Sequence, residues 1–146
     1  MSVSEGNTLL IGTWGLVSLV AERPDGSTFE PLGPHPSGRI IYDEAGYVTA
    51  MIVGERRNEA TGEPCPPEFL MQFTAYFGTY RVDAVRDEII HNVTTSLNGQ
   101  EASGELRRHY RVENGKFLLF FSRVRDGVEI IIRLEWKRIF PSVISN

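Results

Sequence analysis

The chain has 146 residues, which fits one domain with a sizeable buried core. Hydrophobic residues make up 41% and charged residues 23%, close to the averages for soluble globular proteins. The net charge of -4 supplies no basic face for nucleic acid and disfavours binding to an anionic membrane surface.

We expect no targeting or membrane-spanning segment in this sequence. Its first residues lack the basic start and long apolar run of a secretory signal, and no apolar run approaches the roughly 18 residues of a membrane helix. Cys65 is the single cysteine, which excludes an internal disulfide and a thiolate metal cluster. We therefore expect a cytoplasmic protein without membrane or nucleic-acid partners.

Short β-rich runs separated by turn residues dominate the chain. The runs hold β-branched and aromatic residues, and their boundaries hold Gly, Pro, Asn or Asp, which suit the backbone angles of turns. A short extended piece is expected at 28–32. The expected strands, in chain order, are 13–22, 39–43, 47–53, 79–82, 88–97, 105–113, 116–124 and 128–138.

Most of the connections are short turns. Pro24-Asp25-Gly26 ends the first strand, residues 43–46 form a tight hairpin, and Asn114-Gly115 is a strong hairpin signal. The exception is the proline-rich stretch 54–67, which we expect to form a long loop over one mouth of a barrel.

One segment, 67–77, has a helical pattern. Phe69, Phe73 and Phe77 recur every fourth residue, and Gly78 suits a helix end. We expect a short helix here, between the third and fourth strands. Its aromatic face could form a lid over the barrel or a plug inside it.

The fold class follows from the connections between the strands. Parallel pairing would need a helical crossover after nearly every strand, and the sequence lacks them. Eight antiparallel strands closed on themselves leave an interior that can hold one small ligand. We expect an all-β, up-and-down antiparallel β-barrel of about eight strands in a single domain over 1–146, with the barrel at about 10–140.

Alternation along each strand predicts which side chains face inward. The first strand is apolar on both faces, which suggests that a loop or helix covers its outer side. The more apolar face of the strand 105–113 includes Arg108, and if this face is the inner one, the cation needs a carboxylate, an aromatic face or an anionic ligand. The strand 88–97 leaves its register open. In the last strand, the packed face is Val128, Ile130, Ile132, Leu134 and Trp136.

Several motifs resemble one family. Leu10-Ile11-Gly12-Thr13-Trp14-Gly15-Leu16-Val17-Ser18 is similar to the opening Leu-x-Gly-Thr-Trp-x-Leu-Val-Ser of a compact bacterial and fungal lipocalin-like family. Further matches are Pro31-Leu32-Gly33, Gly38-Arg39-Ile40-Ile41-Tyr42, Gly46-Tyr47, Tyr76-x-Gly78-x-Tyr80 and Arg133-Leu134-Glu135-Trp136. The resemblance implies an up-and-down barrel with a capped cavity for an apolar or amphipathic ligand. Some relatives sit beside natural-product pathways, where such barrels bind, cyclise or isomerise an intermediate.

The resemblance also implies a structural barrel floor. In lipocalins a late-strand arginine often stacks on the tryptophan of the opening motif, here Trp14. We assign Arg133 to this place, with Arg138 as the open alternative, because strand parity does not decide between them.

Titratable and aromatic side chains supply the candidate site. His91 is the candidate general acid or base, since its ordinary pKa lies near neutrality, and Arg108 and Tyr110 complete a candidate catalytic set. The sequence offers no metal ligands at a binding spacing, no phosphate loop and no nucleophile elbow, so we expect no metal and no cofactor. The candidate ligand-binding residues are Tyr47, Met51, Phe69, Phe73, Tyr76, Tyr80, His91, Arg108 and Tyr110.

Three functions remain open at this point. The leading one is binding of a small, largely apolar organic molecule, such as a secondary-metabolite intermediate, as a monomer or a homodimer. The second is a cofactor-independent isomerase, cyclase or hydratase acting on a polyketide- or terpenoid-like substrate in the same cavity. The third is a structural module with a filled barrel, which a cavity below about 300 Å³ would favour.

Overall fold

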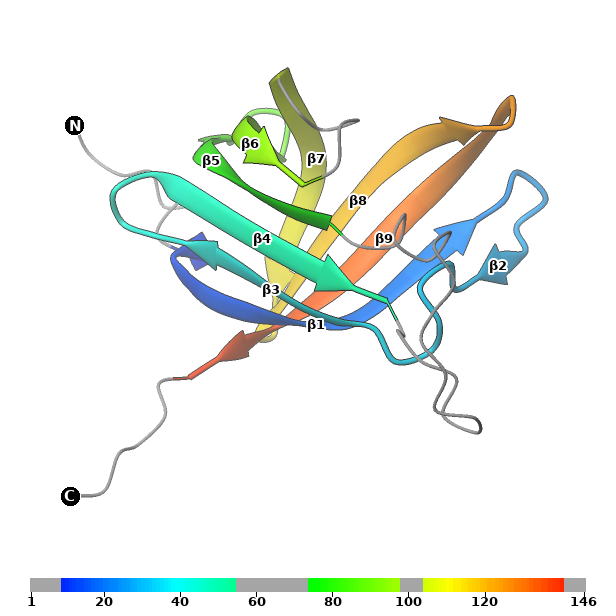
Figure 1. Ribbon diagram of the computed structural model, residues 1–146, viewed down its shortest axis with the longest axis horizontal. Helices are drawn as coiled ribbons and strands as arrows, with labels where there is room; N and C mark the ends of the chain where they lie inside the picture. The colour runs from blue at the N-terminus through cyan, green and yellow to red at the C-terminus, as the bar shows by residue number, and fades with distance from the viewer. Residues whose placement is uncertain (1–8, 55–73, 98–103, 141–146) are drawn as a thin grey trace.

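The computed structural model describes residues 9–54, 74–97 and 104–140. Nine antiparallel strands wrap around one interior (Figure 1). They are β1 (Gly12–Glu22), β2 (Thr28–Phe29), β3 (Ser37–Tyr42), β4 (Tyr47–Val53), β5 (Thr74–Asp83), β6 (Glu88–Ser96), β7 (Gly104–Glu113), β8 (Lys116–Arg125) and β9 (Val128–Ile139).

The sheet closes on itself. Its order is β2-β1-β3-β4-β5-β6-β7-β8-β9, and β1 also pairs with β9. Eight strands therefore form the barrel, while the two-residue strand β2 pairs with β1 beside it. The predicted all-β, antiparallel up-and-down barrel of eight strands is confirmed.

Two hairpins join the last three strands with the tightest turns. Asn114 and Gly115 have φ values of 52° and 75°, and Asp126 and Gly127 have φ values of 52° and 76°. Left-handed conformation at both central residues matches the right-handed twist of the flanking strands. The Asn114-Gly115 hairpin is thus confirmed.

The expected helix is wrong over residues 74–77, which lie in β5. A spacing of four residues also equals two strand periods, so an aromatic residue at every fourth position fits one face of a strand as well as one face of a helix. Phe77 lies on the outer face of β5 and is half-exposed. The rest of the expected helix, 67–73, and the expected loop beyond Gly54 lie outside the described residues.

A β-bulge explains why β1 is apolar on both faces. The register with β9 shifts between Leu16 and Ser18, so that Val17 is the extra residue. The inward face therefore changes from even to odd positions: Trp14 is buried before the bulge, and Leu19 and Ala21 are buried after it. Val17 itself is 46% exposed, so the expected cover over the outer side of this strand is wrong there.

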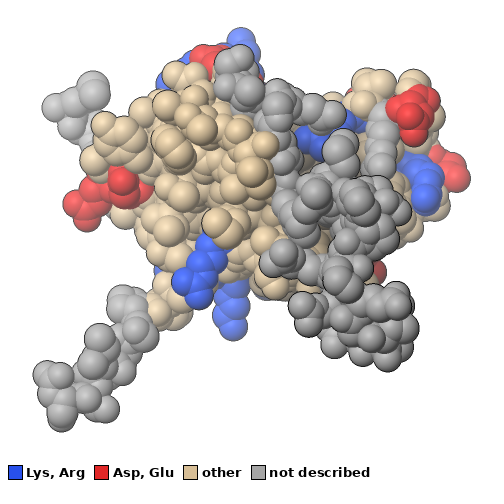
Figure 2. Space-filling view, in the orientation of Figure 1, with Lys and Arg blue, Asp and Glu red and all other residues tan. Residues whose placement is uncertain are grey.

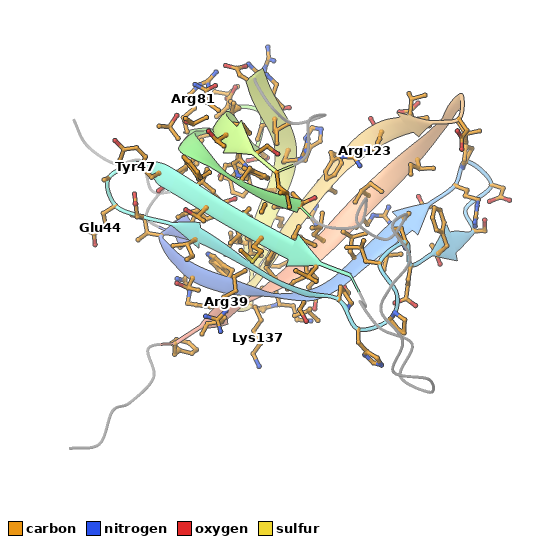
Figure 3. All side chains as sticks on the ribbon, in the orientation of Figure 1. Arg39, Glu44, Tyr47, Arg81, Arg123 and Lys137 are labelled. Atoms are coloured by element: carbon orange, nitrogen blue, oxygen red, sulfur yellow. The ribbon has the colours of Figure 1, made fainter. Side chains whose placement is uncertain are left out.

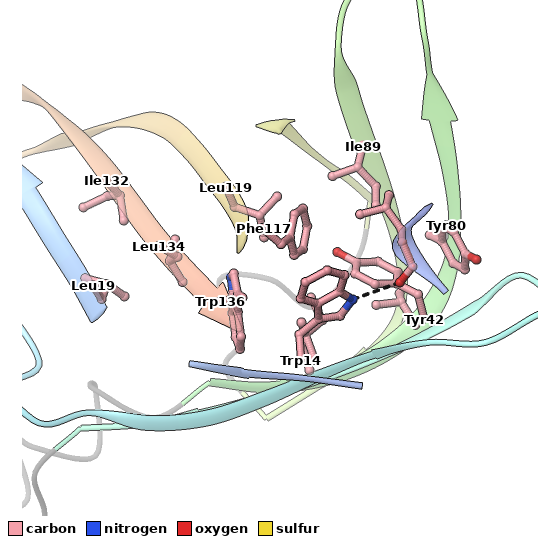
Figure 4. Close-up of a cluster of buried hydrophobic side chains, with 14 of the residues drawn as sticks. Trp14, Leu19, Tyr42, Tyr80, Ile89, Phe117, Leu119, Ile132, Leu134 and Trp136 are labelled. Atoms are coloured by element: carbon pink, nitrogen blue, oxygen red, sulfur yellow. Dashed lines mark hydrogen bonds between the residues drawn. The ribbon is translucent and has the colours of Figure 1, made fainter. Parts of the chain in front are cut away.

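The core fills one end of the barrel. Trp14, Tyr42, Phe117 and Trp136 are fully buried, and Figure 4 shows their rings gathered between β1, β3, β8 and β9. On β9 the predicted packed face holds from Ile130 to Trp136, whereas Val128 at the strand start is exposed.

The outer surface carries mixed charge. On the face shown in Figure 2, acidic and basic side chains of the described residues are interspersed around a broad uncharged area. Within the described ranges, no helix is long and apolar enough to cross a membrane.

Candidate functional site

The barrel encloses a cavity of about 500 Å³. Its polar side chains are Thr74, Tyr76, His91, Arg108, Arg123 and Asp126. Most of the residues that line it are apolar: Leu19, Pro31, Leu32, Ile40, Ala50, Ile52, Leu119, Phe121, Val124, Ile130, Ile132, Leu134 and Trp136.

A tyrosine–histidine–tyrosine chain links three strands at the cavity. His91, on β6, is 1% exposed. The hydroxyl of Tyr42, from β3, lies 2.7 Å from His91 Nε2, and the hydroxyl of Tyr76, from β5, lies 2.6 Å from His91 Nδ1. Both imidazole nitrogens are therefore engaged by phenols, and His91 reaches the cavity together with Tyr76.

Burial sets the protonation of the tyrosine–histidine–tyrosine chain. It lowers the pKa of His91 to about 3, and the nearby Arg108 guanidinium acts in the same direction. Burial also raises the pKa of the Tyr42 phenol well above its ordinary value. At neutral pH the His91 imidazole is therefore uncharged, and the Tyr42 phenol is protonated.

Arg108 brings a positive charge to the cavity wall. Side chains on β7 are half-buried at alternate positions, and Arg108 is one of them, as the alternation of the sequence predicts. Its guanidinium carbon lies 3.7 Å from the centroid of the Phe121 ring, and Nη1 donates to the Arg107 carbonyl over 3.2 Å. The aromatic face of Phe121 is thus one means by which the wall holds the cation.

The opposite end of the barrel is closed by Trp14 and Arg138. Trp14 Nε1 donates to the Leu10 carbonyl over 2.9 Å (Figure 4), and the Arg138 guanidinium lies 4.2 Å from the centroid of the Trp14 ring system. Arg138 also donates to the Ile11 carbonyl over 2.8 Å and to the Leu9 carbonyl over 2.6 Å.

The assignment of Arg133 to this floor is wrong. Its side chain is exposed and forms an ion pair with Glu22 over 3.4 Å. Alternation on β9 turns Arg133 outward, whereas Trp136 and Arg138 share the inward face.

Two of the expected ligand-binding residues lie on the outside of the barrel. On β4, Val48 and Ala50 face inward, so Tyr47 and Met51 face outward and are 56% and 55% exposed. Figure 3 shows Tyr47 projecting from the start of β4, away from the interior. Neither side chain faces the cavity, because the register of this strand turns both of these positions outward.

The other expected contacts divide into three groups. Tyr76, His91 and Arg108 line the cavity. Tyr80 is buried, and its hydroxyl donates to the Asp43 carbonyl over 2.9 Å. Tyr110 is half-buried, and burial raises the pKa of its phenol. Neither tyrosine belongs to the cavity wall. Phe69 and Phe73 lie outside the described residues.

Sequence reasoning missed Tyr42. Tyr42 shares the inward face of β3 with Ile40. The even numbering that the two residues share is the one sequence signal that could have placed Tyr42 inside the barrel. Ile41 between them is also apolar, so the run did not reveal its inner face, and only the folded barrel brings Tyr42 against His91.

Comparison with known proteins identifies the family. No curated protein matches the sequence. The family model of the lipocalin-like domain matches residues 11–139, from the residue before β1 to the end of β9. Because this match covers the whole closed barrel, the chain belongs to the lipocalin-like domain family.

Proposed function

We propose that the protein binds a small, largely apolar organic molecule inside its barrel. The supporting observation is the cavity of about 500 Å³, which is lined by thirteen apolar residues and six polar ones. Cavities of roughly 300–1,000 Å³ with this composition are typical of small-molecule sites. The cavity size also argues against a structural module with a filled barrel.

The family resemblance suggests the kind of ligand. Some lipocalin-like relatives sit beside natural-product pathways, and a secondary-metabolite intermediate is the ligand class we propose on that basis. An apolar body would pack against the aliphatic wall around Ile40, Leu119 and Ile132, where burial of its surface favours binding.

A cofactor-independent enzyme is the second candidate. It is supported by the presence of Tyr76, His91 and Arg108 on one cavity wall. Because both nitrogens of His91 contact phenols, Tyr76 would be the group that exchanges a proton with a substrate, and His91 would act through it. Substitution of Tyr76 by phenylalanine would then lower turnover far more than affinity, whereas in a carrier it would change affinity alone.

Filling the cavity tests the binding function. Ala50 faces the cavity and its neighbour Met51 faces solvent, so Ala50→Phe and Met51→Phe add an aromatic ring to the two sides of the same strand. We expect N-phenyl-1-naphthylamine to bind the wild type, with a fluorescence increase on titration. We expect Ala50→Phe to weaken binding at least tenfold, about 1.4 kcal/mol, and Met51→Phe to stay within twofold.

Circular dichroism spectra of both variants control for folding. A folded Ala50→Phe variant with unchanged affinity would contradict binding in the cavity, and so would a wild type that binds no dye. Should Ala50→Phe fail to fold, Ile52→Phe on the same wall takes its place.

A further inference from the structure

The direction of the hydrogen bonds in the Tyr42–His91–Tyr76 chain can be worked out from Tyr42. Its side chain is fully buried, and its only polar partner among the described residues is His91 Nε2. Its ring also packs against the rings of Tyr80 and Phe117. A buried O–H without an acceptor costs about 1–3 kcal/mol, so Tyr42 donates to Nε2.

This donation fixes the tautomer of His91. A neutral imidazole has one N–H and one acceptor nitrogen. If Nε2 accepts, the proton is on Nδ1, and Nδ1–H donates to the Tyr76 hydroxyl oxygen, 2.6 Å away. The O–H of Tyr76 is then directed to a partner other than His91, and it is a stronger donor because its oxygen already accepts a hydrogen bond.

Further hydrogen-bond donors belong to the same cavity wall. A guanidinium and an indole can only donate hydrogen bonds, and Arg108 and Trp136 both line the cavity. Trp136 Nε1 is buried and has no acceptor among the described residues. The one carboxylate of the described wall, Asp126, lies in the exposed turn between β8 and β9. The inner part of the wall is therefore rich in donors.

We propose that the Tyr42–His91–Tyr76 chain directs the Tyr76 hydroxyl proton into the cavity, where Tyr76 and Arg108 bind an acceptor oxygen of the ligand. The ligand class is an apolar molecule that carries a carbonyl or carboxylate group. This inference rests on the proposed function, since it requires a ligand in the cavity. Tyr76 touches the ligand, while Tyr42 and His91 are positioning residues.

The tautomer of His91 can be measured without any ligand. In a protein labelled with ¹⁵N, long-range proton–nitrogen correlations distinguish the protonated from the unprotonated ring nitrogen. We expect a protonated Nδ1 in the wild type and a shift toward protonated Nε2 in Tyr42→Phe, which keeps the ring and removes the donor. A protonated Nε2 in the wild type would overturn the proposal.

A matched series of ligands tests the chemistry of the wall. 2-Acetylnaphthalene, 2-naphthoate, 2-ethylnaphthalene and 2-naphthylmethylammonium share one apolar body and differ in the attached group. By isothermal titration calorimetry, we expect the ketone and the carboxylate to bind at least tenfold more tightly than the hydrocarbon, and the ammonium compound to bind most weakly.

Single-residue variants test which side chains cause the preference for the ketone and the carboxylate. Tyr76→Phe should remove most of the ketone's advantage and leave the affinity for 2-ethylnaphthalene unchanged within twofold, and Arg108→Met should do the same for the carboxylate. Tyr42→Phe should reduce the ketone's advantage severalfold, although Tyr42 lies outside the cavity wall. Tyr47→Phe, which removes an exposed phenol on the outer face, is the matched control.

The outcomes separate this inference from the proposed function. If all four compounds bind with equal affinity, or the ammonium compound binds best, the donor-rich wall is overturned and small-molecule binding stands. If none of the four binds, the proposed function fails and this inference fails with it.

Discussion

His91 shows how burial decides the charge of a single side chain. Among the described residues, the polar groups that face it are the phenols of Tyr42 from β3 and Tyr76 from β5, and the guanidinium of Arg108 from β7. None of them carries a negative charge that would stabilise an imidazolium at neutral pH, and Arg108 opposes one. A protonated ring would also have to donate from both nitrogens, so that Tyr42 would lose its acceptor.

This environment makes the stability of the protein depend on pH. The pKa of His91 is about 3 in the folded state and about 6.5 in an unfolded chain, so between these values the unfolded state binds the extra proton. Stability should therefore rise with pH from about 3 to 6.5, and the contribution of His91 should be complete above that range. Between these two pKa values, the unfolding free energy should change by up to about 1.4 kcal/mol per pH unit.

The measurement is the free energy of unfolding in urea between pH 5 and 8, for the wild type, His91→Gln and His109→Gln. We expect His91→Gln to lose most of the slope between pH 5 and 6.5. His109 stacks on Phe120 on the outer side of β7, and its substitution should keep the slope. Equal slopes in all three proteins would show that His91 is not the titrating group.

At the scale of the elements, the sequence predicted strands better than their irregularities. Seven of the eight expected barrel strands match the observed ones within a few residues, because alternation and turn chemistry are local signals. The eighth strand was expected at 79–82 but begins at Thr74. Its first residues were assigned to a helix because the aromatic spacing in 67–77 fits the period of a helix as well as that of a strand. The bulge at Val17 could not be predicted, since it depends on pairing with β9.

Gly78 illustrates the same point. Its position after the aromatic run suggested a helix end, but it lies inside β5 at a second bulge, where the pairing with β6 shifts between Phe77 and Gly78. A Cβ at this position would collide with the Asn92 carbonyl oxygen and would lie 2.9 Å from its carbonyl carbon. The glycine is thus required by the close approach of two backbones.

Gly78→Ala should therefore destabilise the protein by about 2–3 kcal/mol, because the backbone of β6 must move to admit the methyl group. The neighbouring Thr79→Ala changes an exposed position on the same strand and should cost less than about 1 kcal/mol. Urea unfolding of both variants gives the comparison. If the two substitutions cost the same, the close approach of β5 and β6 does not constrain this position.

At the scale of the whole molecule, the candidate site could be predicted only in part. Tyr76, His91 and Arg108 could be predicted from the sequence, because polar side chains stand out on apolar strands. Their assembly could not, since Tyr42, Tyr76, His91 and Arg108 come from four different strands. Closure of the sheet and the inward register of each strand bring them together, and these properties depend on pairings distant in sequence.

In the described residues, the barrel has a closed end and, apart from it, the cavity of the candidate site. At the closed end, Arg138 covers Trp14 and donates hydrogen bonds to the carbonyls of Leu9 and Ile11. A Cβ added at Gly12 would lie 2.6 Å from Arg138 Nη1. Gly12 therefore leaves room for the Arg138 guanidinium, and Trp14 supplies the ring that the guanidinium covers. Trp14 and Arg138 are absent from the cavity wall, so the closed end and the binding site should be separable.

Arg138→Met tests this separation, because methionine keeps an apolar stem and removes the guanidinium. Loss of two hydrogen bonds and of the contact with Trp14 should cost about 2 kcal/mol and lower Tm by roughly 5–10 °C. Arg133→Met is the matched control on the same strand: its ion pair with Glu22 is exposed, and the cost should stay below about 1 kcal/mol. Dye affinity of the folded protein should remain within twofold in both variants. A large loss of affinity in Arg138→Met would mean that the floor and the cavity act as one unit, since the floor would then control the shape of the wall above it.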